Sequence, residues 1–327
     1  MNYVPPFSIT DEMLNITIAV SEKLGQLTNV NGLDNLPRLR RVNRLMSIQS
    51  SLAIENNTLS LRQVTDVING KLVVGPQDDI TAVQNAFEAY GKLDETDAFS
   101  LADLLSVHTV MMKGLVTNAG KLRTGGVGVF DSTGKIVHIA PPPEMVRQLL
   151  TQLFDWVKTS QTNMLIRSCV FHYEFEFIHP FADGNGRMGR LWQTALLTRW
   201  NPLFKWIPVE SIIKDNQQEY YQAIRQSTSI GNSNPFILFM LKVIYQAICR
   251  IQADADSHLA RANGNLLRLL DAMETYPMSA AEIMARLNMK SVNSFRKNYL
   301  TPALQAGLIA MTVPDKPTSR NQRYYKL

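Results

Sequence analysis

Residues 179–190 read HPFADGNGRMGR, a stretch that joins a histidine, an acid, two glycines beside an amide, and two arginines. Gly184 and Gly186 lack Cβ atoms, so consecutive backbone N–H groups near them can converge on an anion. A helical pattern begins at Arg187 and directs the positive end of its dipole to the same point. The stretch therefore predicts a loop followed by a helix whose N-terminus binds phosphate.

The charged side chains of this loop predict phosphoryl or nucleotidyl transfer. Arg187 and Arg190 are three residues apart on the predicted helix, so both guanidinium groups can bind phosphoryl oxygens on one side. Asp183 offers the hard oxygen ligand that Mg²⁺ prefers, and His179 can accept a hydroxyl proton near neutral pH. The chain contains neither GxxxxGK[ST] nor a protein-kinase motif set, which disfavours ordinary NTPase and kinase chemistry.

The sequence around the loop indicates a mainly α fold. Apolar residues recur at three-to-four spacing in segments such as 11–20 and 165–177, which is typical of amphipathic helices. The exception is a region where glycine-rich turns bracket two β-prone pieces, 127–130 and 136–139, followed by three prolines. We expect a small, exposed β-hairpin there.

The C-terminal part predicts a separate basic module, with its boundary in residues 253–265. Ser279 and Glu282 have the spacing of a capping box that opens a short helix. A turn and a second helix follow, and 308–313 and 322–326 then resemble two strands. This order predicts a winged helix.

Charge gives this module a candidate partner. Residues 257–327 contain ten Lys and Arg but four Asp and Glu, whereas the whole chain has a net charge of +5. Asn293, Arg296 and Lys297 would face a DNA major groove and Arg320 and Arg323 the phosphates. A solvated basic face or an interaction domain explains the same charge.

Composition excludes several classes of protein. The chain has 327 residues, of which 45% are hydrophobic and 19% charged, so it is globular rather than disordered. The two cysteines, Cys169 and Cys249, have no metal-site spacing and favour a reducing compartment. No signal-peptide pattern or uninterrupted run of about 20 apolar residues is present. We expect a cytoplasmic protein that does not enter a membrane.

Residues 179–190 match the motif HPFx[DE]GNGRxxR at every defined position, so the sequence resembles the Fic family. The resemblance covers roughly residues 101–245. It implies an all-α core that transfers AMP from ATP to a Tyr, Ser or Thr hydroxyl of a target protein and releases pyrophosphate. By position, His179 would be the base and Asp183 the Mg²⁺ ligand.

The resemblance also implies which residues bind the nucleotide. Asn185, together with the Gly184 and Gly186 amides, would hold the α-phosphate. Arg187 and Arg190 would hold the β- and γ-phosphates.

Two further regions resemble parts of Fic proteins. The hairpin is similar to the flap on which a target segment adds as a strand, along Ile136, Val137, His138 and Ile139. Tyr221 resembles a residue that lines the adenine pocket. Thr228 lies where several relatives have Asn, so the resemblance is weaker there.

Far upstream, Ser51, Glu55 and Asn56 are similar to the inhibitory motif [ST]xxxE[GN]. The resemblance implies that Glu55 pairs with Arg190 and occupies the place of the γ-phosphate. In some relatives this Glu also positions the water that removes AMP from the target, and that reaction is an open alternative.

The sequence thus predicts helices with an inhibitory segment over 1–100, a Fic core over 101–255 and a winged helix over 256–327. An autoinhibited protein adenylyltransferase is the favoured function. A DNA-binding transcriptional regulator with the pocket as a nucleotide sensor is the alternative, and Doc-like or phosphocholine transfer is a third. Self-modification and a homodimer remain open among the partners, and the target protein is not identified.

Overall fold

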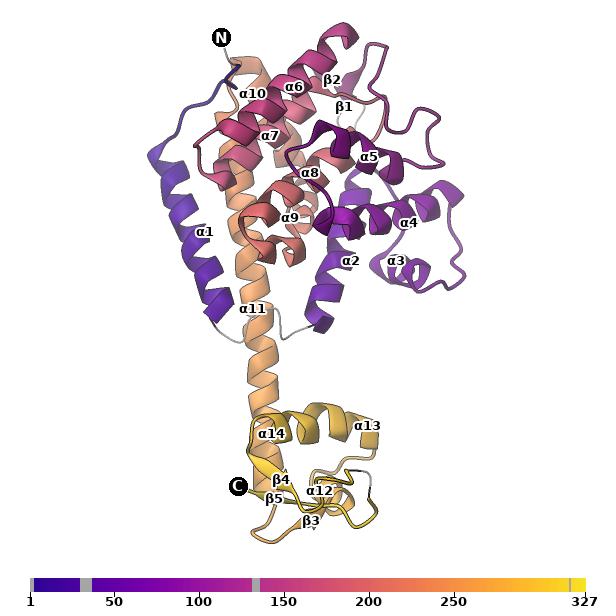
Figure 1. Cartoon of the computed structure of the whole chain (residues 1–327), viewed down its shortest axis with the longest axis vertical. Helices are drawn as coiled ribbons and strands as arrows, with labels where there is room; N and C mark the ends of the chain where they lie inside the picture. Colours follow the sequence, from indigo (N-terminus) through magenta and orange to yellow (C-terminus); the bar gives the residue numbers. More distant parts are fainter. Residues whose placement is uncertain (1–2, 30–36, 131–135, 318) are drawn as a thin grey trace. The chain divides into compact units, whose positions relative to one another are not determined.

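The computed structural model describes residues 3–29, 37–130, 136–317 and 319–327 (Figure 1). Within these ranges, side chains are described except in 28–38, 129–139 and 255–263. The chain divides into two compact units, Met1–Ile251 and Gln252–Leu327. The first unit therefore contains both the predicted N-terminal helices and nearly all of the predicted core.

Helices make up most of the first unit, which agrees with the mainly α prediction. Its elements are α1 (Asp11–Asn29), α2 (Pro37–Ile54), α3 (Leu61–Ile68), α4 (Gln77–Gly91), η2 (Lys92–Asp94), α5 (Leu101–Met111), β1 (Gly128–Phe130), β2 (Ile136–Ile139), α6 (Pro143–Thr159), α7 (Met164–Ile178), α8 (Asn185–Trp200), η3 (Pro202–Trp206), α9 (Val209–Asp215), α10 (Gln217–Ile230) and the start of α11 (Asn234–Ala272).

The core of the first unit is centred on α7 and α8, which pack against each other. Thirteen of the fifteen residues of α7 are buried, so this helix is surrounded by other elements on nearly all sides. Phe171 and Phe175 of α7 and Trp192 of α8 are among the largest fully buried side chains of this core. The loop between α7 and α8 is residues 179–184, so the sequence motif is held between two fixed helix ends.

The predicted hairpin is present. β1 and β2 pair antiparallel, with Gly128 opposite Ile139 and Val129 opposite His138. Residues 140–142 follow the second strand, and Pro143 then begins α6, where its fixed φ suits the first turn of a helix.

The division between the two units lies beside the predicted boundary region and falls within a continuous helix. Residues 253–265 are helical and belong to α11, which is 39 residues long. The part Asn234–Asp254 is long and apolar enough to span a membrane by length and composition, and half of that window is buried. Phe236, Met240 and Ile244 lie in the core, as expected of a core helix.

The second unit has the order of elements of a winged helix. After the end of α11 it contains β3 (Met278–Ser279), α12 (Ala280–Arg286), α13 (Val292–Phe295), the π-turn η4 (Arg296–Leu300), α14 (Thr301–Gln305), β4 (Ile309–Met311) and β5 (Arg323–Lys326). The three strands form an antiparallel sheet in the order β3-β5-β4.

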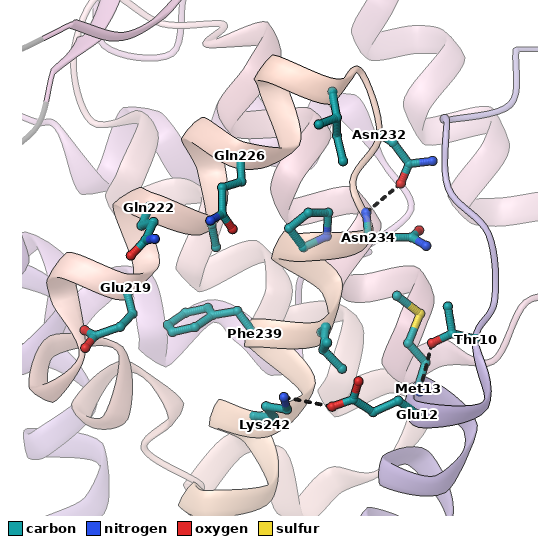
Figure 2. Close-up of a pocket in the computed structure, with 14 residues that line it drawn as sticks. Thr10, Glu12, Met13, Glu219, Gln222, Gln226, Asn232, Asn234, Phe239 and Lys242 are labelled. Atoms are coloured by element: carbon teal, nitrogen blue, oxygen red, sulfur yellow. Dashed lines mark hydrogen bonds and ion pairs between the residues drawn. The ribbon is translucent and has the colours of Figure 1, made fainter.

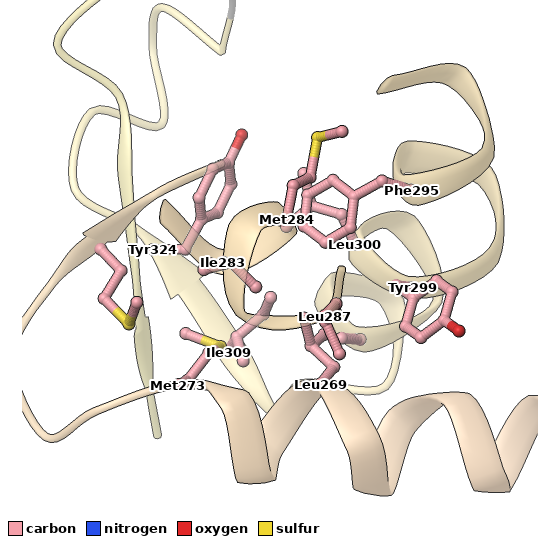
Figure 3. Close-up of a cluster of buried hydrophobic side chains, with 12 residues drawn as sticks. Leu269, Met273, Ile283, Met284, Leu287, Phe295, Tyr299, Leu300, Ile309 and Tyr324 are labelled. Carbon is pink, nitrogen blue, oxygen red and sulfur yellow. The ribbon is translucent and has the colours of Figure 1, made fainter. Parts of the chain in front are cut away.

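A separate hydrophobic core stabilises this unit (Figure 3). Leu269 of α11, Ile283 of α12 and Phe295 of α13 are fully buried in it, and Ile309 joins them from the sheet. The predicted capping box is present, because Ser279 Oγ accepts from the Glu282 N–H while the Glu282 carboxylate accepts from the Ser279 N–H at 2.6 Å.

Candidate active site

His179 ends α7 in the left-handed region, with φ of 50° and ψ of 62°. Its N–H donates to Phe175 O at 2.9 Å, which completes the last turn. This backbone conformation is uncommon for a residue with a side chain and persists where neighbouring contacts hold it. The sharp turn places the half-buried His179 at the start of the loop.

Arg123 supplies several of these contacts. Its guanidinium donates to His179 O at 2.7 Å, to Ile178 O at 3.2 Å, and to Gly125 O and Pro141 O on the two sides of the hairpin. Burial lowers the pKa of this guanidinium, which remains charged. Arg123 therefore fastens the base of the flap to the His179 loop, a role that the sequence pattern did not reveal.

His108 on α5 holds the middle of the loop. Its ring stacks on Phe181 with centroids 3.6 Å apart and an interplanar angle of 6°. Nδ1 accepts from the Gly120 N–H at 2.8 Å, so Nε2 carries the proton and donates to Asp183 O at 3.1 Å. Burial lowers the pKa of His108 to about 4, so the ring is neutral. No local sequence pattern indicates these partners of His108, because they meet it only in the folded chain.

The side chain of Asn185 bonds the backbone of the loop. Its Oδ1 accepts from the Phe181 N–H and its Nδ2 donates to Phe181 O, both at 2.9 Å. Both polar atoms are thus used to close the loop, and Asn185 is 2% exposed. The first N–H groups of α8, by contrast, have no partner within the helix.

The two glycines of the motif are required by close approaches. Gly184 has φ of 84°, and a Cβ there would meet Met112 Sδ at 2.6 Å. A Cβ on Gly186 would collide with Glu55 Oε1. The N-terminus of α8 is consequently open to a carboxylate or phosphate only because position 186 lacks a side chain.

Asp183 stands at the exposed edge of the same helix end. One oxygen accepts from the Gly184 N–H at 2.6 Å and from Arg187 Nη2 at 3.2 Å, and the side chain is 58% exposed. Among the described residues, no group of three or more His, Cys, Asp or Glu is placed to hold a metal ion. A single exposed carboxylate fits Mg²⁺, which commonly takes one or two protein ligands with phosphate oxygens and water.

Arg190 binds the upstream motif. Its Nη2 donates to Glu55 Oε1 at 2.7 Å and to Ser51 O at 3.0 Å, and its Nε donates to Ser51 Oγ at 3.1 Å. Burial opposes the charge of Arg190, but the Glu55 carboxylate raises its pKa above the ordinary value. Asn56 follows with φ of 65°, a left-handed conformation that Asn and Gly adopt readily. Two residues of the upstream motif, Ser51 and Glu55, therefore bind Arg190, and the third, Asn56, adopts the left-handed turn that follows them.

A second carboxyl group, Glu176, faces Arg190 from α7. Burial raises the pKa of Glu176 to about 8, against the opposing effect of Arg190, so this group is protonated at neutral pH. His172 beside it has its pKa lowered to about 3 by burial, and its ring bonds Gln193 and Tyr220. His172 is thus a packing residue, and Glu55 is the carboxylate that pairs with Arg190.

Two small cavities meet at Glu55. One of about 190 Å³ is lined by His179, Gly186, Arg190 and Tyr221, with Glu55 at its edge. Another, of about 180 Å³, contains Asp183 and Arg187 and again Glu55. The Glu55 side chain forms a wall of both cavities. Each is smaller than the roughly 300–1,000 Å³ of an ordinary small-molecule site, so a whole nucleotide requires this wall to move.

Helix α10 separates these cavities from a larger one. Tyr221 and Ile224 face the His179 cavity, whereas Gln222 and Gln226 line a cavity of about 940 Å³ beside α1 and α11 (Figure 2). Thr228 bonds the Tyr173 hydroxyl at 3.3 Å. The predicted adenine-side residue Tyr221 therefore lies with the motif residues.

The backbone of the flap strand lies near the site. Residues 136–139 form β2, which contacts α10, and Gly128 of β1 lines the His179 cavity. The side chains of Ile136, Val137, His138 and Ile139 lie outside the described residues. In the described part of the chain, β2 pairs only with β1, which leaves its other edge for a further strand.

Helical core, flap and loop together define a Fic-type site, and comparisons with known proteins agree. A model of the Fic/DOC family matches residues 98–197, and a model of the C-terminal domain of Filamentation induced by cAMP protein Fic-like matches 264–327. A Fic family protein from Desulfovibrio desulfuricans is 43% identical with a TM-score of 0.75, covering 99% of this chain and 98% of that chain. The chain belongs to the Fic family.

More distant relatives share the fold and part of the sequence. Fic-1 from Caenorhabditis elegans has a TM-score of 0.65 at 24% identity, over 75% of this chain and 73% of that chain. Protein adenylyltransferase fic-1 of Caenorhabditis briggsae is 29% identical over 63% of this chain, and protein adenylyltransferase Fic of Nematostella vectensis is 25% identical over 73%. The chain spans 41% and 56% of the lengths of these last two relatives.

Proposed function

We propose that this protein is an autoinhibited adenylyltransferase that transfers AMP from ATP to a hydroxyl group of a protein. The observation that carries the proposal is the complete Fic loop at the N-terminus of α8, with Arg190 held by Glu55 at 2.7 Å. The names of the relatives, protein adenylyltransferase, support the same reaction.

In this reaction, His179 accepts the proton of the target hydroxyl as its oxygen attacks the α-phosphorus of ATP. The bond between the α-phosphorus and the bridging oxygen breaks, and pyrophosphate leaves with the electron pair. Arg187 and Arg190 hold the leaving phosphates, and the amides of α8 stabilise the charge on the α-phosphate. Tyr221, which lines the same cavity as His179, would contact the adenine.

Mg²⁺, when bound at Asp183, would neutralise the negative charge that develops on the phosphates. Arg187 donates to the same carboxylate at 3.2 Å and so keeps Asp183 at the edge of the phosphate site. Release of this contact would let Arg187 turn toward the nucleotide.

Autoinhibition follows from competition for Arg190. The Glu55 carboxylate occupies the guanidinium that would hold the terminal phosphate and adds negative charge beside it. ATP then binds weakly or with its α-phosphate out of line for attack. The same carboxylate could also orient water for removal of AMP from a modified protein, a second activity measured as loss of label from that protein.

The test is labelling with radiolabelled ATP and Mg²⁺ for four forms of the protein. Glu55→Gly is expected to raise self-labelling or labelling of lysate proteins at least tenfold, because it frees Arg190 and joins the two cavities. Glu55→Gly combined with His179→Ala is expected to abolish labelling. Glu95→Gly removes an exposed acid elsewhere and is expected to match the wild type.

Two results would refute the proposal. Labelling that persists unchanged after His179→Ala would show that His179 is not the base. Equal labelling by the wild type and Glu55→Gly would show that Glu55 does not inhibit the reaction. Mass spectrometry of the labelled proteins identifies the modified residues, and self-modification of this chain is one outcome. Size-exclusion chromatography with light scattering tests whether the active form is a homodimer.

A second candidate function is DNA binding by the C-terminal unit. Asn293, Arg296 and Lys297 are all exposed at the position of a winged-helix recognition helix, which favours this function. Arg323 is less suited to phosphate binding, because its guanidinium already donates to Pro277 O and Glu282.

A further inference from the structure

The arginines at the start of α2 surround a cavity that the nucleotide site does not use. This cavity has a volume of about 500 Å³. Its walls come from four elements of the first unit: Arg40, Arg41, Arg44 and Leu45 of α2, Ile68 of α3, Phe87 of α4 and Trp206 of η3. A mostly apolar wall with a few convergent charges is the usual make-up of a site for a small organic ligand.

Trp206 concentrates positive charge in this cavity. The guanidinium groups of Arg40 and Arg44 lie 5.4 and 4.9 Å from the centroid of its ring, and Lys205 Nζ lies 5.1 Å away. Lys205 is paired with Asp94. Arg41 donates to the uncharged Asn69 Oδ1 at 2.6 Å, so its charge is not neutralised by that contact.

Arg44 is the residue whose placement most favours an anionic ligand. Its Nε and Nη2 are shielded from solvent and have no hydrogen-bond acceptor among the described residues. Burial lowers the pKa of Arg44, and Asp94 only partly opposes that effect. Such unsatisfied, partly buried donors are costly unless an acceptor reaches them. An anionic head group in the cavity would provide that acceptor after a small rotation of the guanidinium.

The cavity and the inhibitory contact share one helix. Ser51 lies seven residues beyond Arg44 on α2, about 10 Å along the helix. A ligand that contacts α2 together with α3, α4 and η3 holds α2 in the position seen here. In that position Ser51 and Glu55 bind Arg190.

We propose that this cavity binds a small organic anion, a phosphate or carboxylate group on a flat apolar body, and that binding strengthens the Glu55–Arg190 contact. The anionic group lies against Arg41 and Arg44, and the apolar body lies between Trp206 and Phe87. By reciprocity, ATP binding that displaces Glu55 weakens binding of the anion. The regulatory half of this inference rests on the proposed adenylyltransferase function, but the binding half does not.

Isothermal titration calorimetry with phenyl phosphate and with benzoate tests the binding half on the full chain. At least one of the two probes is expected to bind, and the stronger one identifies the head group. Inorganic phosphate, which lacks the apolar body, is expected to bind at least tenfold more weakly. Arg44→Gln and, separately, the exposed Arg41→Gln are each expected to weaken binding about tenfold.

Arg62→Gln is the matched control, since it removes an exposed arginine of α3 outside the cavity. Thermal melting of each variant verifies folding, and the probe is expected to raise the melting temperature of the wild type and Arg62→Gln but not of Arg44→Gln. The binding half is overturned if neither probe binds, or if both cavity variants bind as tightly as Arg62→Gln.

AMP labelling in the presence of the probe tests the regulatory half. The probe is expected to lower labelling by the wild type and to leave Glu55→Gly unaffected, because that variant has no inhibitory contact to strengthen. Equal inhibition of both forms would overturn the coupling. If no form is labelled, the adenylyltransferase proposal fails, whereas the calorimetric result still decides whether the cavity is a site.

Discussion

His108 and Asn185 show how the loop obtains its shape from side chains that do not take part in the chemistry. The imidazole bonds Asp183 O and stacks on Phe181, while the carboxamide bonds both backbone groups of Phe181. Each contact uses a buried polar group whose loss would leave its partner unsatisfied. The shape of the loop before α8 is thus set by residues that act through the backbone.

The low pKa of His108 predicts how stability depends on pH. The unfolded chain gains a proton on this histidine near its ordinary pKa of about 6.5, whereas the folded chain does so only near 4. Stability contributed by His108 is therefore present above pH 6.5 and is lost as the pH falls toward 4. At pH 5 the loss from this group is about 2 kcal/mol.

Urea unfolding of the wild type and His108→Gln at pH 7.5 and pH 5 measures this effect. At pH 7.5 the wild type is expected to have a larger free energy of unfolding than His108→Gln. This difference in the free energy of unfolding is expected to be smaller at pH 5. Effects of other titrating groups cancel in the difference when they are independent of His108. A difference that is constant with pH would show that folding leaves the pKa of His108 unchanged, and would contradict the prediction.

At the level of the elements, α13 and the following η4 carry the candidate DNA-contacting residues of the C-terminal unit, and Arg296 and Lys297 both lie in η4. If this unit binds DNA, Arg296→Ala with Lys297→Ala is expected to weaken binding to genomic fragments at least tenfold and to reduce its salt dependence, because two phosphate or base contacts are lost. Electrophoretic mobility shift at two salt concentrations is the measurement.

Lys326→Ala is the control for net charge, because Lys326 is an exposed lysine of β5 outside the recognition helix. Equal weakening by Lys326→Ala would indicate binding by overall charge alone. Arg323→Ala is expected to lower the melting temperature instead, since Arg323 bonds Pro277 O and Glu282.

Local signals predicted the elements that depend on short stretches of sequence. The capping box at Ser279 and the hairpin strands are local features, set by hydrogen bonds and turn residues within a few positions. Glu55 and Arg190 are separated by 135 positions in the sequence. Their contact was predicted from the resemblance of both motifs to Fic proteins. Pattern alone would have left Glu55 as one of many helix carboxylates.

The continuation of α11 through residues 253–265 was missed for a physical reason. This segment is rich in Ala, Asp and Asn, and its apolar periodicity is weak. Ala has the highest helix propensity, so a helix already nucleated by the apolar residues before it can continue at little cost. The roles of His108 and Arg123 could not be predicted from neighbouring residues, because they depend on tertiary contacts.

At the scale of the whole molecule, the two units have separate hydrophobic cores. A substitution in one core is therefore expected to lower the stability of that unit without lowering the stability of the other. Phe295 is fully buried in the C-terminal core (Figure 3), so Phe295→Ala is expected to destabilise that unit by about 3–5 kcal/mol. Hydrogen exchange is expected to become faster across residues 264–327, while amides of α7 and α8 keep their protection and AMP labelling by Glu55→Gly is unchanged. Val292→Ala, at a half-exposed position of the same helix, is the control.

The outcome distinguishes a C-terminal unit that only accompanies the Fic core from one on which the core depends. Faster exchange in α7 and α8 after Phe295→Ala would mean that the cores unfold together. Unchanged exchange in the core with reduced labelling would mean that the C-terminal unit affects catalysis without supporting the fold. Independent behaviour is expected, because the hydrophobic cluster around Phe295 is drawn entirely from residues 266–324.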